Sequence, residues 1–360
     1  MTAILITSQI ESVRVGCVKY LNARPLIRGW PGNVEFDHPS ALCQRLAKGQ
    51  LDVALVSSFE FLRNPIYRIV DDVSISSDGP VYSVVVAHRG EFSDIEEIEL
   101  DPASETAVNL LRCLLAELGL TARLTGAVPE SAGLPRARLI IGDQAISFRQ
   151  NHADAFQFWD LGEQWKKLTG LPFVYALWLI RPEVPDAKSI AQRLRGLRDE
   201  NLADIRVIVS DAVADAADNK QEITQEFLDR YYNEHLRFGF GTREKQGLQT
   251  FADLCSKHGV LPKRAREFSL RVGSCIAIER LVLRSMSEIN ASRRSNRGRD
   301  REAASLRPVK WNLKLDSITI DDKTARPGEE RVFHFGQVFV FAEFEMELSR
   351  RFQVLQRFGI

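Results

Sequence analysis

Polar side chains gather where the first apolar run of the chain ends. Val13 to Val18 is typical of a strand, and the residues after it include Lys19, Tyr20, Asn22 and Arg24. In open α/β sheets, ligands bind beyond the carboxyl ends of strands, where the next helix offers unpaired N–H groups and the positive end of its dipole. Amide and cationic side chains at such a point favour an anionic small molecule as the ligand.

The same residues also have a purely structural interpretation. Asn22 can cap a helix that contains Pro25 in its first turn, where a missing N–H costs little. Lys19 and Arg24 can be solvated surface charges. Taken alone, this segment leaves the ligand site and the helix cap as alternatives.

Familiar catalytic and metal-binding signatures are missing from the sequence. It contains no Gly-rich phosphate or dinucleotide loop, no HExxH and no GxSxG, and its six histidines are scattered. The five cysteines are dispersed and show no CxxC spacing. We therefore expect no metal, reduced thiols and a cytoplasmic protein, with a site assembled from polar groups on several strand ends.

The composition is that of an ordinary globular protein with an ample core. The chain has 360 residues, of which 44% are hydrophobic, and 48 basic residues balance 48 acidic ones. This length predicts two domains. The balance of charge gives no case for a nucleic acid or a membrane as partner, and no apolar stretch approaches membrane-spanning length.

Strand and helix patterns alternate through roughly the first 260 residues, which predicts an α/β protein with mostly parallel sheets. A strand at 51–56 ends in Ser57 and Ser58, so polar groups again follow a strand. The clearest helix runs from Ser104 to Leu118 and carries Thr106 in its first turn. For these four hydroxyl residues, capping and contact with an anionic ligand remain alternatives.

The order of elements predicts two lobes joined twice, with strand ends facing one cleft, although a single doubly wound sheet fits the alternation nearly as well. The expected first lobe combines residues 1–90 and 184–262, and the second is inserted at 91–183. Residues 263–310 hold thirteen Lys/Arg against five Asp/Glu, which predicts a flexible basic linker. Alternation within 311–360 predicts a small β appendage.

Five segments, occurring in one order, resemble chorismate dehydratase of the futalosine route to menaquinone. They are Val15 to Leu26, Gly49 to Ser58, Gly79 to Ser83, Ile140 to Ala145, and Asp160 to Val174. The resemblance covers about residues 13 to 260. It implies a type II periplasmic-binding-protein-like fold used for catalysis, in which chorismate loses water to give 3-[(1-carboxyvinyl)oxy]benzoate, with no cofactor.

The resemblance also implies site residues. Asn22 is the leading catalytic candidate and Ser83 the second, with Asn22 near the reacting ring and Ser83 on a carboxylate. Neither is a strong base, so the proton acceptor is left open between a substrate carboxylate, a water and a further side chain. The expected substrate-binding residues are Tyr20, Arg24, Ser57, Ser58, Ser104 and Thr106.

Two features depart from the family pattern. Ala107 stands where another hydroxyl residue is expected, and family members generally end near residue 262, so residues 263–360 take no function from the resemblance. Two other functions stay open. One is a cytoplasmic sensor of the same fold that binds a small anion without turnover, and the other is nucleic-acid binding by the basic stretch, which lacks a recognised motif. The sequence does not specify the oligomeric state.

Overall fold

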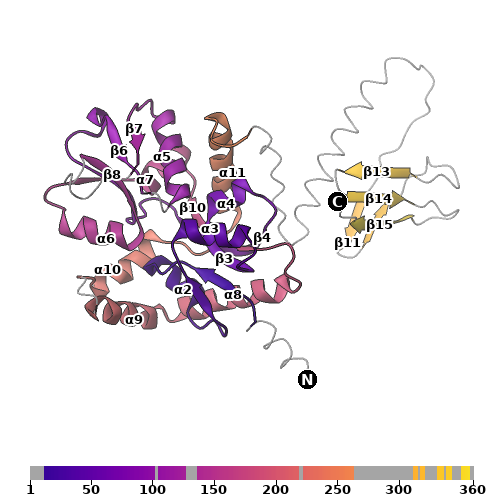
Figure 1. Ribbon diagram of the computed structural model, residues 1–360. Helices are drawn as coiled ribbons and strands as arrows, with labels where there is room; N and C mark the ends of the chain where they lie inside the picture. The colour runs from indigo at the N-terminus through magenta and orange to yellow at the C-terminus, as the bar shows by residue number, and fades with distance from the viewer. Residues whose placement is uncertain are drawn as a thin grey trace, which may run out of the picture. The chain divides into compact units, whose positions relative to one another are not determined.

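The computed structural model describes residues 12–101, 104–126, 136–218 and 222–262, and the backbone of five strands between 311 and 356. The chain forms two compact units, Met1–Val282 and Leu283–Ile360. The first unit holds two five-stranded sheets and the helices around them (Figure 1). It therefore contains all the predicted site residues.

The first sheet has the order β2-β1-β3-β10-β4. Its strands are β1 (Val15–Cys17), β2 (Val34–Phe36), β3 (Val53–Ser57), β4 (Arg68–Ser77) and β10 (Phe173–Ile180). β1 is parallel to β2 and β3, whereas β10 is antiparallel to β3 and β4.

The second sheet has the order β7-β6-β8-β5-β9. Its strands are β5 (Val84–His88), β6 (Glu97–Glu99), β7 (Arg123–Thr125), β8 (Ala137–Ile141) and β9 (Gln157–Asp160). β5 is antiparallel to both its neighbours, and β6 is parallel to β7 and β8.

The prediction of an α/β protein is confirmed, but the prediction of mostly parallel sheets is wrong. The exceptions are the two strands by which the chain changes sheet: β5 follows β4 into the second sheet, and β10 follows β9 back into the first. β5 follows β4 without a crossover helix that would make it parallel to its neighbours, whereas β10 follows β9 through the helix α7 (Leu161–Thr169) and enters the first sheet from the second. The lobe boundaries stay a prediction. β5 is expected in the first lobe but pairs within the second sheet, and β10 is expected in the second lobe but pairs within the first sheet, so the sheets favour shifting both boundaries.

Helices cover the sheets along the chain. In the first half they are η1 (Leu21–Ala23), α2 (Arg24–Ile27), α3 (Pro39–Ala47), α4 (Ser58–Arg63), η2 (Phe92–Asp94), α5 (Glu105–Glu117), α6 (Gly142–Asn151) and α7 (Leu161–Thr169). In the second half they are α8 (Ala187–Ala203), α9 (Ile205–Asp218), α10 (Gln225–Arg230), the π-helical turn η4 (Tyr231–His235) and α11 (Thr242–Lys257).

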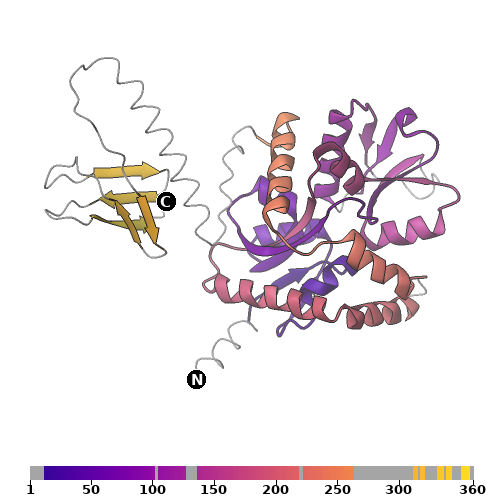
Figure 2. The same cartoon turned by 180° about the vertical axis from the view of Figure 1, so that it is seen from behind.

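The long helices after β10 pack back onto earlier elements. α8 packs on α2 and β4, and α11 lies against β10 and α5 (Figures 1 and 2). The core between sheets and helices includes the fully buried indoles of Trp165 and Trp178, as expected for core anchors. The return from the second half of the chain therefore places η4 beside segments that lie far away in sequence.

Several ends of helices and strands follow from local features of the sequence and backbone. Ser104 caps α5 as predicted, its hydroxyl accepting the N–H of Ala107 at 3.2 Å. After Val81 the chain becomes a strand only at Val84, because Tyr82 has a φ of +68°. Gly142 and Asp143, which directly follow β8, form the first turn of α6.

The second unit contains one antiparallel sheet of order β11-β12-β15-β14-β13. The strands are β11 (Trp311–Lys314), β12 (Ser317–Ile320), β13 (Arg331–Phe335), β14 (Val338–Ala342) and β15 (Arg350–Gln356). All five strands lie within residues 311–360, where the alternation predicts a small β appendage. The predicted basic linker, residues 263–310, lies outside the described residues.

Candidate functional site

The segment after β1 contains the leading candidate residue. Asn22 lies in the middle of η1 and caps neither η1 nor α2, whose N-cap positions are Tyr20 and Ala23 and carry no side-chain cap bond. The helix-cap interpretation of Asn22 is therefore wrong. Its Oδ1 atom is buried and has no hydrogen-bond partner among the described residues. An unpaired amide oxygen in such a place is available to a ligand.

The backbone next to Asn22 is held from two sides. The N–H of Leu21 donates to both carboxylate oxygens of Asp143, at 3.0 and 3.3 Å. The phenol of Tyr232 donates to the Leu21 carbonyl at 2.8 Å. Asp143 belongs to α6, after the second sheet, and Tyr232 belongs to η4. Two distant segments thus fix the position of the residue that precedes Asn22.

Burial shapes the electrostatics of this corner. Desolvation raises the pKa of Asp143 to about 6, against the opposing effects of the Leu21 N–H and of Arg24. The ring of Tyr20 lies over Gly142, and burial, reinforced by Asp101 and Asp143, raises the pKa of this phenol to about 12. Tyr20 is therefore a neutral hydrogen-bonding group at physiological pH.

Arg24 is half-buried and pairs with Asp215 at 2.8 Å. Its charge also acts on Asp143 and Tyr232, where it opposes the larger effect of burial, which raises the pKa of both groups. Lys19 is exposed, which agrees with its interpretation as a solvated surface charge. Arg24 is therefore the cation of this segment that lies near the candidate site, and it already has an acidic partner.

Ser83 lies immediately before β5 on a segment with unusual backbone geometry. Tyr82 adopts a positive φ of +68°, which is costly for a side chain of this size. The buried carboxylate of Asp160 accepts the N–H groups of Val81 and Tyr82 at 3.0 and 2.8 Å. The same carboxylate caps α7. Asp160 therefore holds the backbone that presents Ser83.

Tyr231 brings the two leading candidates together. Its phenol donates to Ser83 Oγ at 2.7 Å, and the side chain of Asn22 acts on the same phenol, lowering its pKa against the larger effect of burial. Tyr231 and Ser83 are both fully buried. Asn22 and Ser83, predicted from separate motifs, thus share one partner and form a single polar cluster with it.

The four other predicted hydroxyl residues form a second group. Ser57, at the end of β3, is hydrogen-bonded to Thr106 in the first turn of α5, and Thr106 also accepts the N–H of Phe59 at 3.3 Å. Ser58 is fully buried and donates to the Val174 carbonyl at 2.7 Å. Within this group, Ser57 and Thr106 directly join elements of the two sheets.

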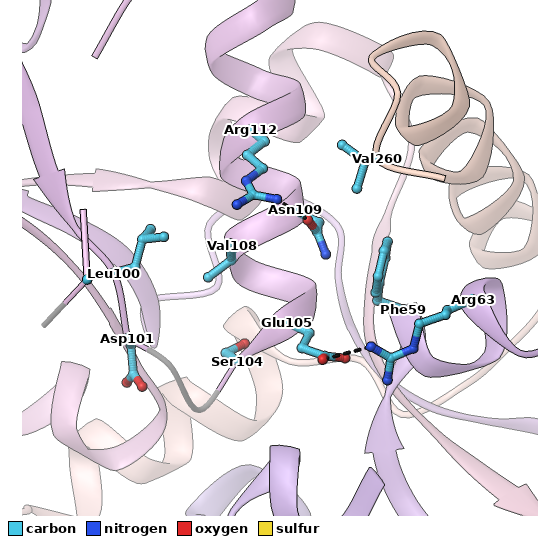
Figure 3. Close-up of a pocket in the computed structure, with 11 residues that line it drawn as sticks. Phe59, Arg63, Leu100, Asp101, Ser104, Glu105, Val108, Asn109, Arg112 and Val260 are labelled. Carbon is cyan, nitrogen blue, oxygen red and sulfur yellow. Dashed lines mark hydrogen bonds and ion pairs between the residues drawn. The ribbon is translucent and has the colours of Figure 1, made fainter. Parts of the chain in front are cut away.

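A pocket of about 430 Å³ lies between α4 and the first half of α5 (Figure 3). Its lining includes Phe59, Arg63, Ser104 and Asn109, and Arg63 spans it to reach Glu105 at 2.8 Å. Of the predicted site residues, Ser104 lines this pocket, and Asn22 and Ser83 are not in its lining. The pocket and the Asn22–Ser83 cluster are therefore separate features of the described structure.

A group of potential metal ligands lies beside the pocket. Cys43, Glu60 and Glu105 bring ligand atoms within 4.8 Å of one another. Arg63 forms ion pairs with both glutamates, so its guanidinium already balances their negative charge in place of a metal ion. Burial, together with the two carboxylates, raises the pKa of the Cys43 thiol to about 12, which disfavours the thiolate that would bind a metal. We assign no metal to this group.

Sequence reasoning missed Tyr231, Tyr232 and the positioning function of Asp160. Tyr231 is 148 residues from Ser83, and nothing in the local pattern of a helical region distinguishes it from a core residue. The one available signal was the adjacent pair of tyrosines in a segment otherwise rich in charged residues.

A family model described as menaquinone biosynthesis matches residues 13–257. The chain belongs to this menaquinone biosynthesis family. The match contains every predicted site residue and ends where α11 ends. The enzymatic character expected from the resemblance is thereby supported at the level of the family.

Two curated relatives of the family are similar to this chain, and both are named chorismate dehydratase. The one from Thermus thermophilus is 29% identical over 262 residues, which cover 66% of this chain and 93% of the relative. The one from Campylobacter jejuni is 30% identical over 159 residues, or 44% of this chain and 58% of the relative.

Solved structures establish the fold of this family member. A protein from Archaeoglobus fulgidus superposes with a TM-score of 0.54 at 14% identity, covering 69% of this chain and 98% of that one. The periplasmic aliphatic sulphonate binding protein from Escherichia coli gives 0.53 at 14%, covering 74% and 98%. The predicted periplasmic-binding-protein-like α/β fold is confirmed. No helix in the described part of the chain has the length and apolar character needed to span a bilayer.

Proposed function

We propose that this chain is a chorismate dehydratase, a carbon–oxygen lyase that converts chorismate to 3-[(1-carboxyvinyl)oxy]benzoate and water in menaquinone biosynthesis by the futalosine pathway. The observation that carries the proposal is the similarity to the Thermus thermophilus enzyme, which extends over 93% of that protein. The polar cluster of Asn22, Ser83 and Tyr231 supports it, because it supplies directed hydrogen bonds at the ends of two strands.

This reaction requires that the protein position the substrate more than that it supply a strong acid or base. Chorismate carries two carboxylates, and it becomes aromatic when the ring proton beside the enolpyruvyl ether and the neighbouring hydroxyl are lost as water. Aromatisation supplies the driving force. The protein must hold the dianion, stabilise the charge that spreads toward the ring carboxylate, and assist departure of the hydroxyl group.

The contacts of the cluster suggest a role for each residue. The free Oδ1 of Asn22 accepts a hydrogen bond from the ring hydroxyl and fixes its orientation. Ser83 donates to a carboxylate oxygen of the substrate. Tyr20 and Arg24 border the same corner and contribute a neutral donor and a positive field. Asp143 already accepts the Leu21 N–H through both oxygens, so we assign it to positioning.

Ser57, Thr106 and Ser104 contribute less directly. Ser57 and Thr106 are bonded to each other, and they contact substrate only when the two sheets separate at this point. The hydroxyl of Ser104 already accepts a hydrogen bond as the cap of α5, and the hydroxyl of Ser58 already donates to a buried backbone carbonyl. We therefore propose substrate contact for Ser57 and Thr106, and structural roles for Ser58 and Ser104.

We also propose a cytoplasmic location. The four described cysteines, Cys17, Cys43, Cys113 and Cys255, are buried free thiols. Cys113 and Cys255 lie with their sulfur atoms 3.7 Å apart and are not joined. Neighbouring thiols in this state are typical of a reducing compartment.

The test is incubation of the purified protein with chorismate, followed by identification of the product by mass spectrometry. The expected product is lighter than chorismate by one water, and Asn22→Ala should reduce kcat by about 100-fold, the usual cost of losing one directed group in an active site. Asn151→Ala, on the exposed end of α6, is the matched control.

Two results would contradict the proposal. Failure of the wild-type protein to form the dehydrated benzoate excludes the enzyme, and stoichiometric binding of chorismate without product favours the sensor of the same fold. Full activity of Asn22→Ala would leave the reaction in place but overturn the site assignment.

A further inference from the structure

Tyr231 contacts the two strand-end segments of the site through one π-helical turn. The turn is closed by a hydrogen bond from the Leu236 N–H to the Tyr231 carbonyl at 3.1 Å. Its members reach different segments: Tyr231 bonds to Ser83, Tyr232 bonds to the Leu21 carbonyl, and the ring of His235 bonds to the Pro80 carbonyl at 3.1 Å. Isolated π-helical turns are rare and occur frequently at functional sites.

The hydrogen bond between Tyr231 and Ser83 has a defined direction. Burial raises the pKa of the Tyr231 phenol far above its ordinary value, so the group keeps its proton at any physiological pH. A phenol carries one proton, and here that proton goes to Ser83 Oγ. The Asn22 side chain acts to lower the pKa of the same phenol, against the larger effect of burial.

A serine hydroxyl has one proton to donate and two lone pairs to accept with. Because Oγ of Ser83 already accepts from Tyr231, it keeps one lone pair and its own proton, and donation of that proton is the use of the hydroxyl that the phenol does not satisfy. The Tyr231 phenol and the Ser83 hydroxyl therefore form a directed pair, in which the phenol donates and the serine proton is left for a further acceptor. Hydrogen bonds arranged head to tail in this way polarise and strengthen one another in a buried site.

We propose that Tyr231 is a positioning residue that directs the Ser83 hydroxyl to donate its proton toward a substrate oxygen. The inference rests on the proposed function, since the acceptor is an anionic oxygen of chorismate. It predicts a preference for ligands that present an acceptor at this point over ligands that present a donor there.

The rest of the environment of Tyr231 keeps this direction fixed. Phe227 stacks on its ring with centroids 5.6 Å apart and an interplanar angle of 15°. Tyr232 and His235 flank it at 5.7 and 6.5 Å. An aromatic side chain enclosed on these sides cannot turn its hydroxyl away from Ser83 without repacking its neighbours.

The experiment is a double-mutant cycle on chorismate turnover with Tyr231→Phe and Ser83→Ala. Tyr231→Phe keeps the ring and removes the donor, so kcat/KM should fall by about tenfold, the value of one neutral hydrogen bond at 1.4 kcal/mol per decade. In the Ser83→Ala background the same change should have no further effect, which a purely structural role would not produce. Tyr67→Phe, at a buried tyrosine bonded to Glu60, is the matched control and should match the wild type.

Several results overturn the inference. These are wild-type kinetics in Tyr231→Phe, or an equal loss in both backgrounds. If Tyr231→Phe does not fold, 3-fluorotyrosine at position 231 replaces it: the more acidic phenol should keep or raise the rate, and a tenfold fall contradicts the proposal.

If the wild-type protein binds chorismate without turnover, the proposed function fails. The double-mutant cycle is then measured on the Kd for chorismate by calorimetry, where absence of coupling between the two substitutions overturns the inference. Absence of binding overturns both.

Discussion

The carboxylate of Asp143 accepts the backbone N–H of Leu21 at 3.0 Å, which ties the start of α6 to the segment that carries Asn22. This bond connects the end of β8 in the second sheet to the end of β1 in the first. It is made by a carboxylate that burial makes harder to ionise, with a pKa raised to about 6. The contact between the two sheets therefore includes a group that is costly to keep charged.

This cost makes stability depend on pH in a predictable way. The pKa of Asp143 is raised in the folded protein to about 6 from an ordinary value of 3.8. Above pH 6 the carboxyl group is ionised in both folded and unfolded states, and the buried charge destabilises the fold by about 2–3 kcal/mol. Below about pH 4 it is protonated in both states and the cost disappears.

Asp143→Asn should therefore stabilise the protein at pH 8 by about 2–3 kcal/mol, and the gain should shrink toward zero as the pH falls to about 4. An amide oxygen at this position can still accept the Leu21 N–H. The measurement is urea denaturation of both proteins across this pH range. Asp154→Asn, at an exposed residue, should show no such trend. A constant or inverted difference would mean that Asp143 is not a buried charge.

Gly142 should be intolerant of a side chain. It has a φ of +59°, a Cβ would lie 3.2 Å from the Tyr20 ring, and its N–H donates to the Ser83 carbonyl at 2.8 Å. Gly142→Ala should therefore destabilise the protein and lower kcat, because any adjustment moves the segments of both Asn22 and Ser83.

Gly170 provides the control for backbone strain. Its φ is +70°, and no atom lies within 4 Å of a Cβ built there. Gly170→Ala should cost about 1–2 kcal/mol from the left-handed backbone alone. Thermal denaturation and turnover of the two variants separate strain from the Tyr20 contact. If both lose the same stability and keep full kcat, the packing of Tyr20 on Gly142 has no consequence for the site.

Thr106 allows a test of substrate binding at the second group of hydroxyls. Thr106→Val keeps the volume but removes the bond to Ser57 and the acceptor for the Phe59 N–H. With substrate contact at this point, KM should rise by about tenfold, equivalent to about 1.4 kcal/mol, while kcat changes little. Thr106→Ser keeps the hydroxyl and should remain close to the wild type. A loss of stability in Thr106→Val with an unchanged KM would indicate that the contact is only structural.

Part of the site could be predicted from sequence because its residues flank strands. Asn22 follows β1 and Ser83 precedes β5, so each stands next to a strongly apolar run, although the two strands belong to different sheets. The five segments that resemble the family in one order then indicated which of these polar residues belong to the site. Ser104 was predictable as a cap because capping depends on residues three positions apart.

Other features depend on long-range packing that no local pattern records. The phenols of Tyr231 and Tyr232 meet their partners over 148 and 211 residues. The reversed direction of β5 and β10 follows from the two passages between sheets, and neither strand differs in composition from a parallel one. Gly142 and Asp143 begin α6, although a Gly-Asp pair after a strand has the composition of a turn.

The boundary of the catalytic unit should lie just after α11. Leu261 is 4% exposed and packs into the core of the first unit, four residues after α11 ends at Lys257. The family match ends at residue 257. A protein truncated after Pro262 should therefore keep the kcat and KM of the full chain, because every residue assigned to the site and its supports lies before this point.

Truncation after Lys257 is the matched variant, since it also removes Val260 and Leu261. Losing the buried Leu261 side chain should cost about 2–3 kcal/mol and lower the midpoint of thermal unfolding, while any folded fraction keeps its activity. Both truncations are measured by calorimetry and by chorismate turnover against the full chain. A large loss of kcat in the longer truncation would show that residues 263–360 take part in catalysis, which the geometry of the Asn22, Tyr231 and Ser83 cluster does not require.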